Sequence, residues 1–186
     1  TLSNRAYYFY AIGKLSESKK IFLQAIALAS KAQANNIIVE SSIHLADLFL
    51  VSGLYDSAQQ YYQSALELSR QAPIDLKVLS NVGMSRFHIR RGELEPALQF
   101  TEEAVRLANK ASAGTQAQAW LQMGRVQVEL ARFDQAETSL NHAARLGDKG
   151  GNLTALIYLE EAMILHGRGK FEESLRVYSQ ALSHHR

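Results

Sequence analysis

The stretch Gly53-Leu54-Tyr55-Asp56-Ser57-Ala58 joins a turn glycine to an aromatic residue, an acid and a small residue, and Ala65 follows Ala58 by seven positions. Variants of this phrase occupy residues 13–18, 92–97, 131–136 and 169–174. The five turn positions therefore lie 40, 39, 39 and 38 residues apart. A constant period in this range is typical of solenoids, in which each repeat stacks on its neighbours. We expect the whole chain to be one array of repeats.

Each repeat is predicted to be a pair of helices. Apolar residues recur with helical spacing from Ile43 to Leu50 before the turn and from Tyr55 to Leu68 after it. Glycine suits the left-handed residue that ends a helix, and an acid suits the first turn of the next helix. Asp134 and Glu137 also have the spacing of a capping box. The predicted fold class is all-α, with about ten helices and no sheet.

Two small-residue positions in each repeat predict how the helices approach one another. They lie seven residues apart on one face of the second helix, where a small side chain lets a neighbouring helix come close. Alanine is also simply a good helix former, but all ten positions hold alanine or serine. They are Ser18, Ala58, Ala97, Ala136 and Ser174, followed by Ala25, Ala65, Ala104, Ala143 and Ala181.

This residue pattern resembles the tetratricopeptide repeat (TPR). The fourth repeat matches closely, with Trp120, Met123 and Gly124 before the turn and Phe133, Ala136, Leu140 and Ala143 after it. The resemblance implies a right-handed superhelical α-solenoid of about five TPR-like helix hairpins. Common TPR units repeat about every 34 residues. The longer period here is similar to the extended repeats of kinesin light chains, of Pins-type spindle-orientation proteins and of maltose-activator-type bacterial regulators.

The chain is predicted to be a single repeat domain. Its 186 residues are 47% apolar and 20% charged, as in ordinary globular proteins. Helix-stop signals divide it into units of approximately residues 1–35, 36–73, 74–113, 114–150 and 151–186. Thr1 is not a methionine, and no polar capping helix follows His184-His185-Arg186. We therefore expect a fragment of a longer protein.

Composition argues against several kinds of chemistry. The chain has no cysteine, which excludes disulfides and thiolate sites and is compatible with a cytoplasmic location. Its net charge of +2 gives no reason to expect nucleic-acid contact, and no stretch approaches the roughly 20 apolar residues of a membrane span. No catalytic triad or phosphate loop is present. We expect no enzyme activity, no cofactor and no metal, since His44 and Asp47 lack a third ligand.

The resemblance implies that the first helix of each repeat lines a concave surface. Carried over position by position from the second repeat onward, that surface contains no aromatic residue. The clamp positions of chaperone-tail TPRs hold Ser3 and Tyr7 in the first repeat and His44 and Asp47 in the second, so the lysine–asparagine clamp is missing. The predicted residues are Glu40, Ile43, His44, Asp47 and Leu50; Leu79, Val82, Gly83, Arg86, Ile89 and Arg90; Gln118, Leu121, Gln122, Arg125, Val128 and Glu129; and Leu156, Leu159, Glu160, Met163 and His166.

Three arginines lead to a prediction about binding. Arg86 and Arg125 occupy the same position in adjacent repeats, and Arg90 lies one turn from Arg86. Guanidinium groups bind carboxylates through two hydrogen bonds, so these residues are predicted to bind a partner. The alternative is that they pair inside the chain with Asp47, Glu129 or neighbouring glutamates. The predicted site comprises Arg86, Arg90, Arg125, Gln122, Val82, Leu121, Asp47, His44 and Glu129.

The predicted function is a non-enzymatic protein–protein interaction module that binds a peptide or helix of a partner in its concave groove. The alternative is a ligand-sensing domain of a larger signalling or transcriptional regulator. Its effector would be a small molecule, an oligosaccharide or a signal peptide. An aromatic-rich groove would favour the alternative.

Overall fold

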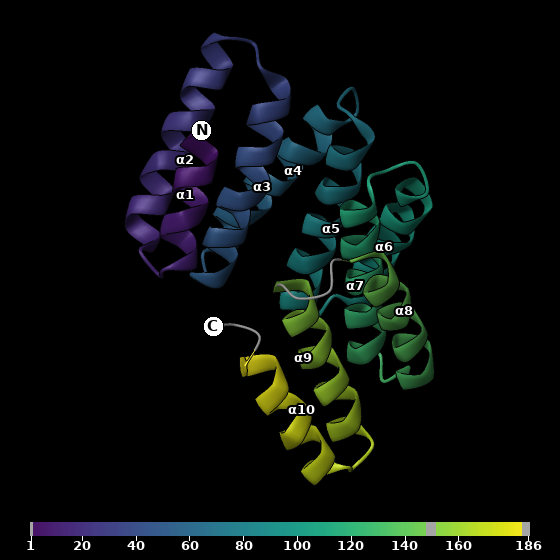
Figure 1. Cartoon of the computed structure of the whole chain (residues 1–186). Coiled ribbons are helices and arrows are strands. Elements are labelled where there is room, and N and C mark those ends of the chain that lie inside the picture. Colours follow the sequence, from purple (N-terminus) through teal and green to yellow (C-terminus); the bar gives the residue numbers. More distant parts are fainter. Residues whose placement is uncertain (1, 148–151, 184–186) are drawn as a thin grey trace.

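A computed structural model describes residues 2–147 and 152–183, and in these ranges the chain consists of ten α-helices without a strand. The predicted all-α fold is therefore confirmed. The predicted boundary between the units 114–150 and 151–186 lies outside the described residues. In chain order the helices are α1 (Leu2–Ala11), α2 (Leu15–Lys31), α3 (Asn35–Val51), α4 (Tyr55–Ser69), α5 (Ile74–Arg90), α6 (Leu94–Ala108), α7 (Ala113–Glu129), α8 (Phe133–Leu146), α9 (Asn152–Gly167) and α10 (Phe171–Ser183) (Figure 1).

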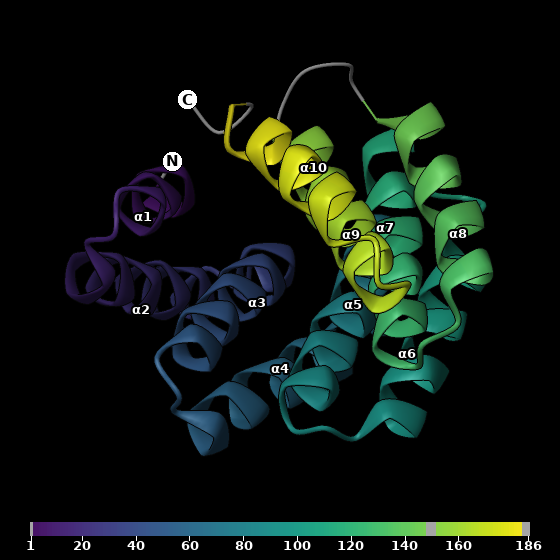
Figure 2. The ribbon, with the colours of Figure 1, turned by 90° about the horizontal axis from the view of Figure 1, so that it is seen from below.

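Successive helices form five antiparallel hairpins that stack side by side. Each odd-numbered helix pairs with the even-numbered helix that follows it and also packs against the next odd-numbered helix. The stack curves into an arc whose two ends are α1 and α10 (Figure 2). Helices α2, α4, α6 and α8 lie on the outside of this arc, so α3, α5, α7 and α9 face its interior.

The five hairpin turns share one backbone geometry. Gly13, Gly53, Gly92 and Gly169 have φ between 73° and 77°, and Ala131 takes the same left-handed conformation with φ of 55°. In every turn the next residue donates its N–H to a carbonyl five residues back, for example Lys14 to Phe9 at 2.8 Å. This is the Schellman ending of a helix. The predicted left-handed turn residue is confirmed even where alanine replaces glycine.

The small positions of the second helices are buried, as predicted. All ten are at most 6% exposed, because the first helix of the same hairpin or of the next one lies against them. The two serines also bond to that neighbour: Ser18 and Ser174 donate their hydroxyls to the carbonyls of Ala6 and Ala162, each at 2.8 Å.

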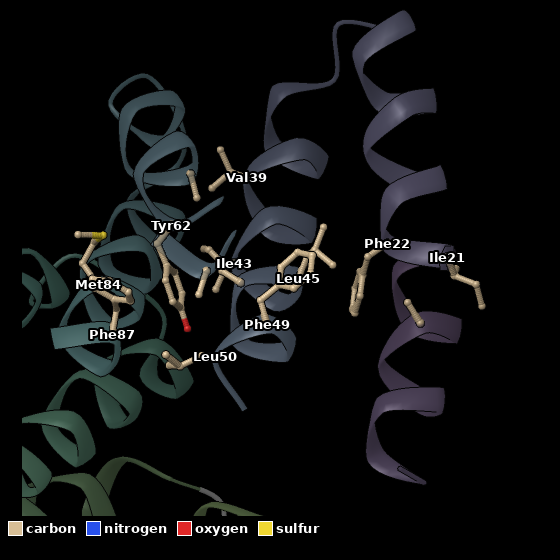
Figure 3. Packing of buried hydrophobic residues seen from close by; sticks show 14 residues of the cluster. Ile21, Phe22, Val39, Ile43, Leu45, Phe49, Leu50, Tyr62, Met84 and Phe87 are labelled. Carbon is tan, nitrogen blue, oxygen red and sulfur yellow. The ribbon is translucent and has the colours of Figure 1, made fainter. Parts of the chain in front are cut away.

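Larger side chains fill the space between hairpins. Figure 3 shows Phe22 of α2, Leu45 and Phe49 of α3, Tyr62 of α4 and Phe87 of α5 in one continuous cluster. Consecutive hairpins therefore share one core, which sets the orientation of the odd-numbered helices.

The predicted capping box at Asp134 and Glu137 is wrong. Helix α8 begins after Arg132 and has no side-chain cap. Both carboxylates instead accept hydrogen bonds from Arg168, in the turn of the following repeat, at 2.5 Å each. The cation holds the two acids because it reaches them from a neighbouring hairpin, a contact that local spacing does not reveal.

Candidate partner-binding groove

The inner face of the arc encloses a groove of about 1120 Å³, lined by residues from α1, α2, α3, α5, α7, α9 and α10. Of the concave residues predicted from the sequence, only Gly83, Val128 and His166 do not line it. Gly83 faces the ring of Tyr62, Val128 belongs to the core, and the ring of His166 lies 5.2 Å from that of Phe171. The nine predicted site residues all line the groove: His44, Asp47, Val82, Arg86, Arg90, Leu121, Gln122, Arg125 and Glu129.

One position in each repeat shows how the groove changes along its length. Six residues before each turn residue stand Tyr7, Asp47, Arg86, Arg125 and Met163, and all five line the groove. Because consecutive repeats stack, this order runs from one end of the groove to the other. It starts with an aromatic side chain, continues with an acid and two bases, and ends with a thioether.

Asp47 and Arg86 connect the second and third repeats. Arg86 Nη1 lies 3.3 Å from Asp47 Oδ1, and the Tyr62 hydroxyl donates a hydrogen bond to the same oxygen. Burial, together with the negative charge of Asp47, raises the pKa of Tyr62 well above its usual value. The side chains of Asp47 and Arg86 are 17% and 30% exposed. The Arg86 guanidinium is therefore anchored to its own chain.

Arg125 and Glu160 connect the fourth and fifth repeats in a similar way. Arg125 Nε donates to Glu160 Oε1 at 2.7 Å, and the Glu160 side chain is 11% exposed. Between these two ion pairs, Gln122 of α7 donates to the hydroxyl of Ser85 on α5 at 2.9 Å. The alternative of internal pairing thus holds for Arg86 and Arg125.

Arg90 and Glu129 are the exposed charges of the central groove. Each lies two residues before a turn position, on the adjacent helices α5 and α7. Neither takes part in an ion pair with any residue that the structure describes. Of the three predicted arginines, Arg90 is therefore the one that forms no ion pair with the described residues.

Aromatic side chains from three helices line one end of the groove. Tyr7 and Tyr10 come from α1, Phe22 from α2 and His44 from α3, and we call these four residues the aromatic corner. The Tyr7 ring lies 6.3 Å from that of Tyr10 and 5.8 Å from that of His44, and Phe22 stacks on His44 at 5.7 Å. Tyr178 of α10 also lines the groove. The statement that the groove has no aromatic residue is thus wrong.

The absence of these aromatic residues from the predicted groove has an identifiable cause. The concave positions were carried over from the second repeat onward, because the first repeat begins inside its first helix. Tyr7 nevertheless stands six residues before Gly13, as Asp47 does before Gly53. Tyr7 was accordingly assigned to a clamp position, but it was left out of the predicted groove residues. Phe22 and Tyr178 lie on second helices, so no rule about first helices would have found them.

His44 is neutral at neutral pH. Burial lowers its pKa below the usual histidine value, and the opposing effects of the Asp47 and Glu40 carboxylates do not restore it. Among the described residues no three His, Cys, Asp or Glu side chains gather as metal ligands. His44 therefore contributes to the groove as a ring rather than as a charge.

Comparison with known proteins agrees with this architecture. The model of the tetratricopeptide repeat matches residues 39–71 and 117–146, which lie in the second and fourth hairpins. No curated protein matches the chain in sequence. These two segments are tetratricopeptide repeats, as the resemblance of the sequence implied.

Solved structures share the fold over almost the full chain. BtubC (BKLC) from P. vanneervenii has a TM-score of 0.70 at 14% identity, over 98% of this chain and 78% of its own. A thermophilic TPR protein of Thermus thermophilus reaches 0.68 at 25% identity, over 98% and 89%. The TPR-like repeats of a putative kinesin light chain of Podosopora anserina reach 0.64 at 14% identity, over 98% and 92%.

The lengths and compositions of the helices bear on membrane insertion. In residues 2–147 and 152–183, none combines the length and the apolar character that a membrane crossing requires.

Proposed function

We propose that this chain is a non-enzymatic interaction module that binds a peptide or helix of a partner protein in its concave groove. Tetratricopeptide repeats mediate protein–protein interactions and are generally scaffolds rather than enzymes. The observation that carries the proposal is the groove itself, which is continuous from α1 to α10. A groove of this kind accepts an extended or helical segment along its length.

The size and lining of the groove favour a macromolecular segment. Its volume of about 1120 Å³ exceeds the roughly 300–1,000 Å³ that is usual for small-molecule sites. Four apolar or aromatic side chains in it remain strongly exposed: Val51 at 49%, Tyr7 at 46%, Met163 at 44% and Tyr178 at 43%. Burial of such side chains against an amphipathic segment would contribute about 25 cal/mol for each Å² removed from water.

The two ion pairs have a defined role in this proposal. Because Asp47 holds Arg86 and Glu160 holds Arg125, these side chains are fixed before a partner arrives. Preorganisation of this kind lowers the entropy cost of binding. Arg90, which is exposed and unpaired within the described chain, is the arginine that we expect to meet a carboxylate of the partner.

The test begins with a random-sequence peptide display library selected on the wild-type chain, which yields a defined peptide for titration calorimetry. Met163→Glu, in the groove, should lower the affinity for that peptide by at least about tenfold, because a charge would replace an apolar contact. Leu28→Glu is the matched control, since Leu28 is 56% exposed on α2 and does not line the groove. Equal affinity for both variants would show that the peptide binds elsewhere.

The second candidate, a ligand-sensing domain, is favoured by one observation: Tyr7, Tyr10, Phe22 and Tyr178 line the groove, whereas the predicted surface contained no tyrosine or phenylalanine. A small effector that binds only the folded state raises its stability by about 2.7 kcal/mol at 100 times Kd. Melting temperatures measured with a panel of oligosaccharides and short peptides distinguish the two functions. A rise with an oligosaccharide would support sensing, and a rise with peptides alone would support the interaction module.

A further inference from the structure

We propose that the aromatic corner, with the carboxylates of Glu40 and Asp47 beside it, receives a lysine or arginine side chain of the partner segment. This inference rests on the proposed function, because it names the chemistry that one end of the groove recognises. Three features carry it: the arrangement of the rings, the balance of charges along the groove, and the neutrality of His44.

The rings present a surface suited to a cation. Tyr7 is 46% exposed, and its ring lies 6.3 Å from that of Tyr10 at an angle of 35°. His44 stacks on the buried ring of Phe22 and holds its own ring 5.8 Å from that of Tyr7. Cations are attracted to aromatic faces within about 6 Å of the ring centre. The long stem of lysine or arginine can also lie along these apolar rings while its charged head stays near water.

The charges that line the groove are not balanced at this end. The lining includes the carboxylates of Glu40, Asp47, Glu129 and Glu160 and the guanidinium groups of Arg86, Arg90 and Arg125. Asp47 pairs with Arg86, and Glu160 pairs with Arg125. Arg90 and Glu129 occupy equivalent positions on the adjacent helices α5 and α7. Glu40 is left without a compensating charge.

Glu40 stands at the aromatic corner. It lies four residues before His44 and therefore one turn away on the same side of α3. It is exposed, and no described residue forms an ion pair with it. Asp47 is also close to His44, since both carboxylates act on the titration of that ring. The uncompensated negative charge of the groove therefore lies close to His44, the ring that α3 contributes to the aromatic corner.

The corner does not neutralise itself. The charged groups that act on His44 are Asp47, Glu40 and Arg86, and Arg86 already shares its charge with Asp47. His44 stays neutral because it is buried, so it does not offset Glu40. An acidic ligand would be repelled here, and an apolar ligand would leave Glu40 uncompensated. A guanidinium or ammonium group would interact favourably with both the rings and the Glu40 carboxylate.

The test is a titration of the whole chain with Nα-acetyl-arginine amide, followed through the aromatic ¹H–¹³C signals of its tyrosines. The control ligand is Nα-acetyl-citrulline amide, which has nearly the same shape and no charge. Tyr7 and Tyr10 should shift in a saturable way, with arginine binding about 3- to 10-fold tighter than citrulline. Tyr8 is the internal control, since it is 60% exposed on the same helix but does not line the groove.

Two variants complete the experiment. Glu40→Gln should remove most of the preference for arginine over citrulline, and Tyr7→Leu should remove the saturable shift, while circular dichroism confirms that both remain helical. Shifts at Tyr8 equal to those at Tyr7 would overturn the proposal. Equal affinity for the arginine and citrulline ligands would also overturn it, because binding to the rings would then not depend on the positive charge.

This experiment also separates the inference from the proposed function. The displayed peptide is titrated against Met163→Glu and Tyr7→Leu. If Met163→Glu abolishes peptide binding while arginine gives no response at Tyr7, the corner proposal fails and the groove proposal stands. If arginine binds at Tyr7 while Met163→Glu leaves the peptide unaffected, the groove proposal fails and the corner remains.

Discussion

Two sets of positions recur in all five repeats, and they behave in opposite ways. The turn residue is left-handed every time, and the two small positions of the second helix are buried every time. The groove position six residues before the turn instead holds tyrosine, aspartate, arginine, arginine and methionine. The packing positions meet the same neighbour in each repeat, so one geometric requirement selects one kind of residue. The groove position has a different environment in each repeat, so the type of side chain found there differs from one repeat to the next.

The comparison is not a simple division between stability and binding. Asp47 and Arg86 stand at the variable groove position, yet they join two repeats through an ion pair, and Tyr62 supports that pair from the core. Tyr7 stands at the same position with nearly half of its surface exposed. We therefore expect groove residues to differ widely in their effect on folding, and substitutions can measure this.

The largest effect is expected for Asp47→Ala, which would show that a groove position can matter as much as a packing position. The change leaves the Tyr62 hydroxyl and the Arg86 guanidinium without their shared acceptor. Because both are largely buried, the free energy of unfolding should fall by about 2–4 kcal/mol. Urea denaturation measures it, with Glu129→Ala as the exposed groove control, expected within about 0.5 kcal/mol. Similar values for the two variants would contradict a structural role for Asp47.

The next effect concerns a packing position. Ala136 is fully buried on α8, so Ala136→Leu should wedge the hairpin open and destabilise the chain by roughly 1–3 kcal/mol. Ala144→Leu makes the same change at an exposed site of the same helix and should stay within about 0.5 kcal/mol. Coincident unfolding curves would mean that small size is not required at the repeated position.

The turns offer a smaller and more specific test. Gly92→Ala should destabilise by about 1 kcal/mol, because a β-carbon is unfavourable at its φ of 73°. Ala131→Gly should instead stabilise the chain, since Ala131 already bears this strain. The gain in the free energy of unfolding should be at most about 1 kcal/mol, because glycine also makes the unfolded chain more flexible. Thermal denaturation of the two variants compares them. Two changes of the same sign would show that the turns are not equivalent.

The smallest effect on stability is expected for Tyr7→Leu. Its ring is half exposed, and leucine keeps an apolar side chain there, so the free energy of unfolding should change by less than about 0.5 kcal/mol. The same variant should lose its response to arginine. A large loss of stability with retained binding of arginine would show that Tyr7 serves folding rather than binding.

Much of the groove could be predicted, because residues at equivalent positions of successive repeats lie on the same face of the stack. Once the turn residues were aligned, residues with equal spacing from them were expected on one face, and the nine predicted site residues do line the groove. The sequence left open whether Arg86 and Arg125 bind a partner or pair inside the chain. Their carboxylates lie 39 and 35 residues away in the chain, too far for local spacing to reveal.

Four features depend only on one repeat and its immediate neighbour: the period, the helix pairs, the left-handed turns and the small packing positions. They could therefore be predicted from the amino-acid sequence. The ion pairs, the bond from Tyr62 to Asp47 and the aromatic corner depend on how far one hairpin is rotated and shifted against the next. A helical side chain can reach several neighbours across such an interface, and only the packing of the shared core selects among them. For this reason the line of residues along the groove follows from spacing, whereas the charges left for a partner follow from the stacked structure.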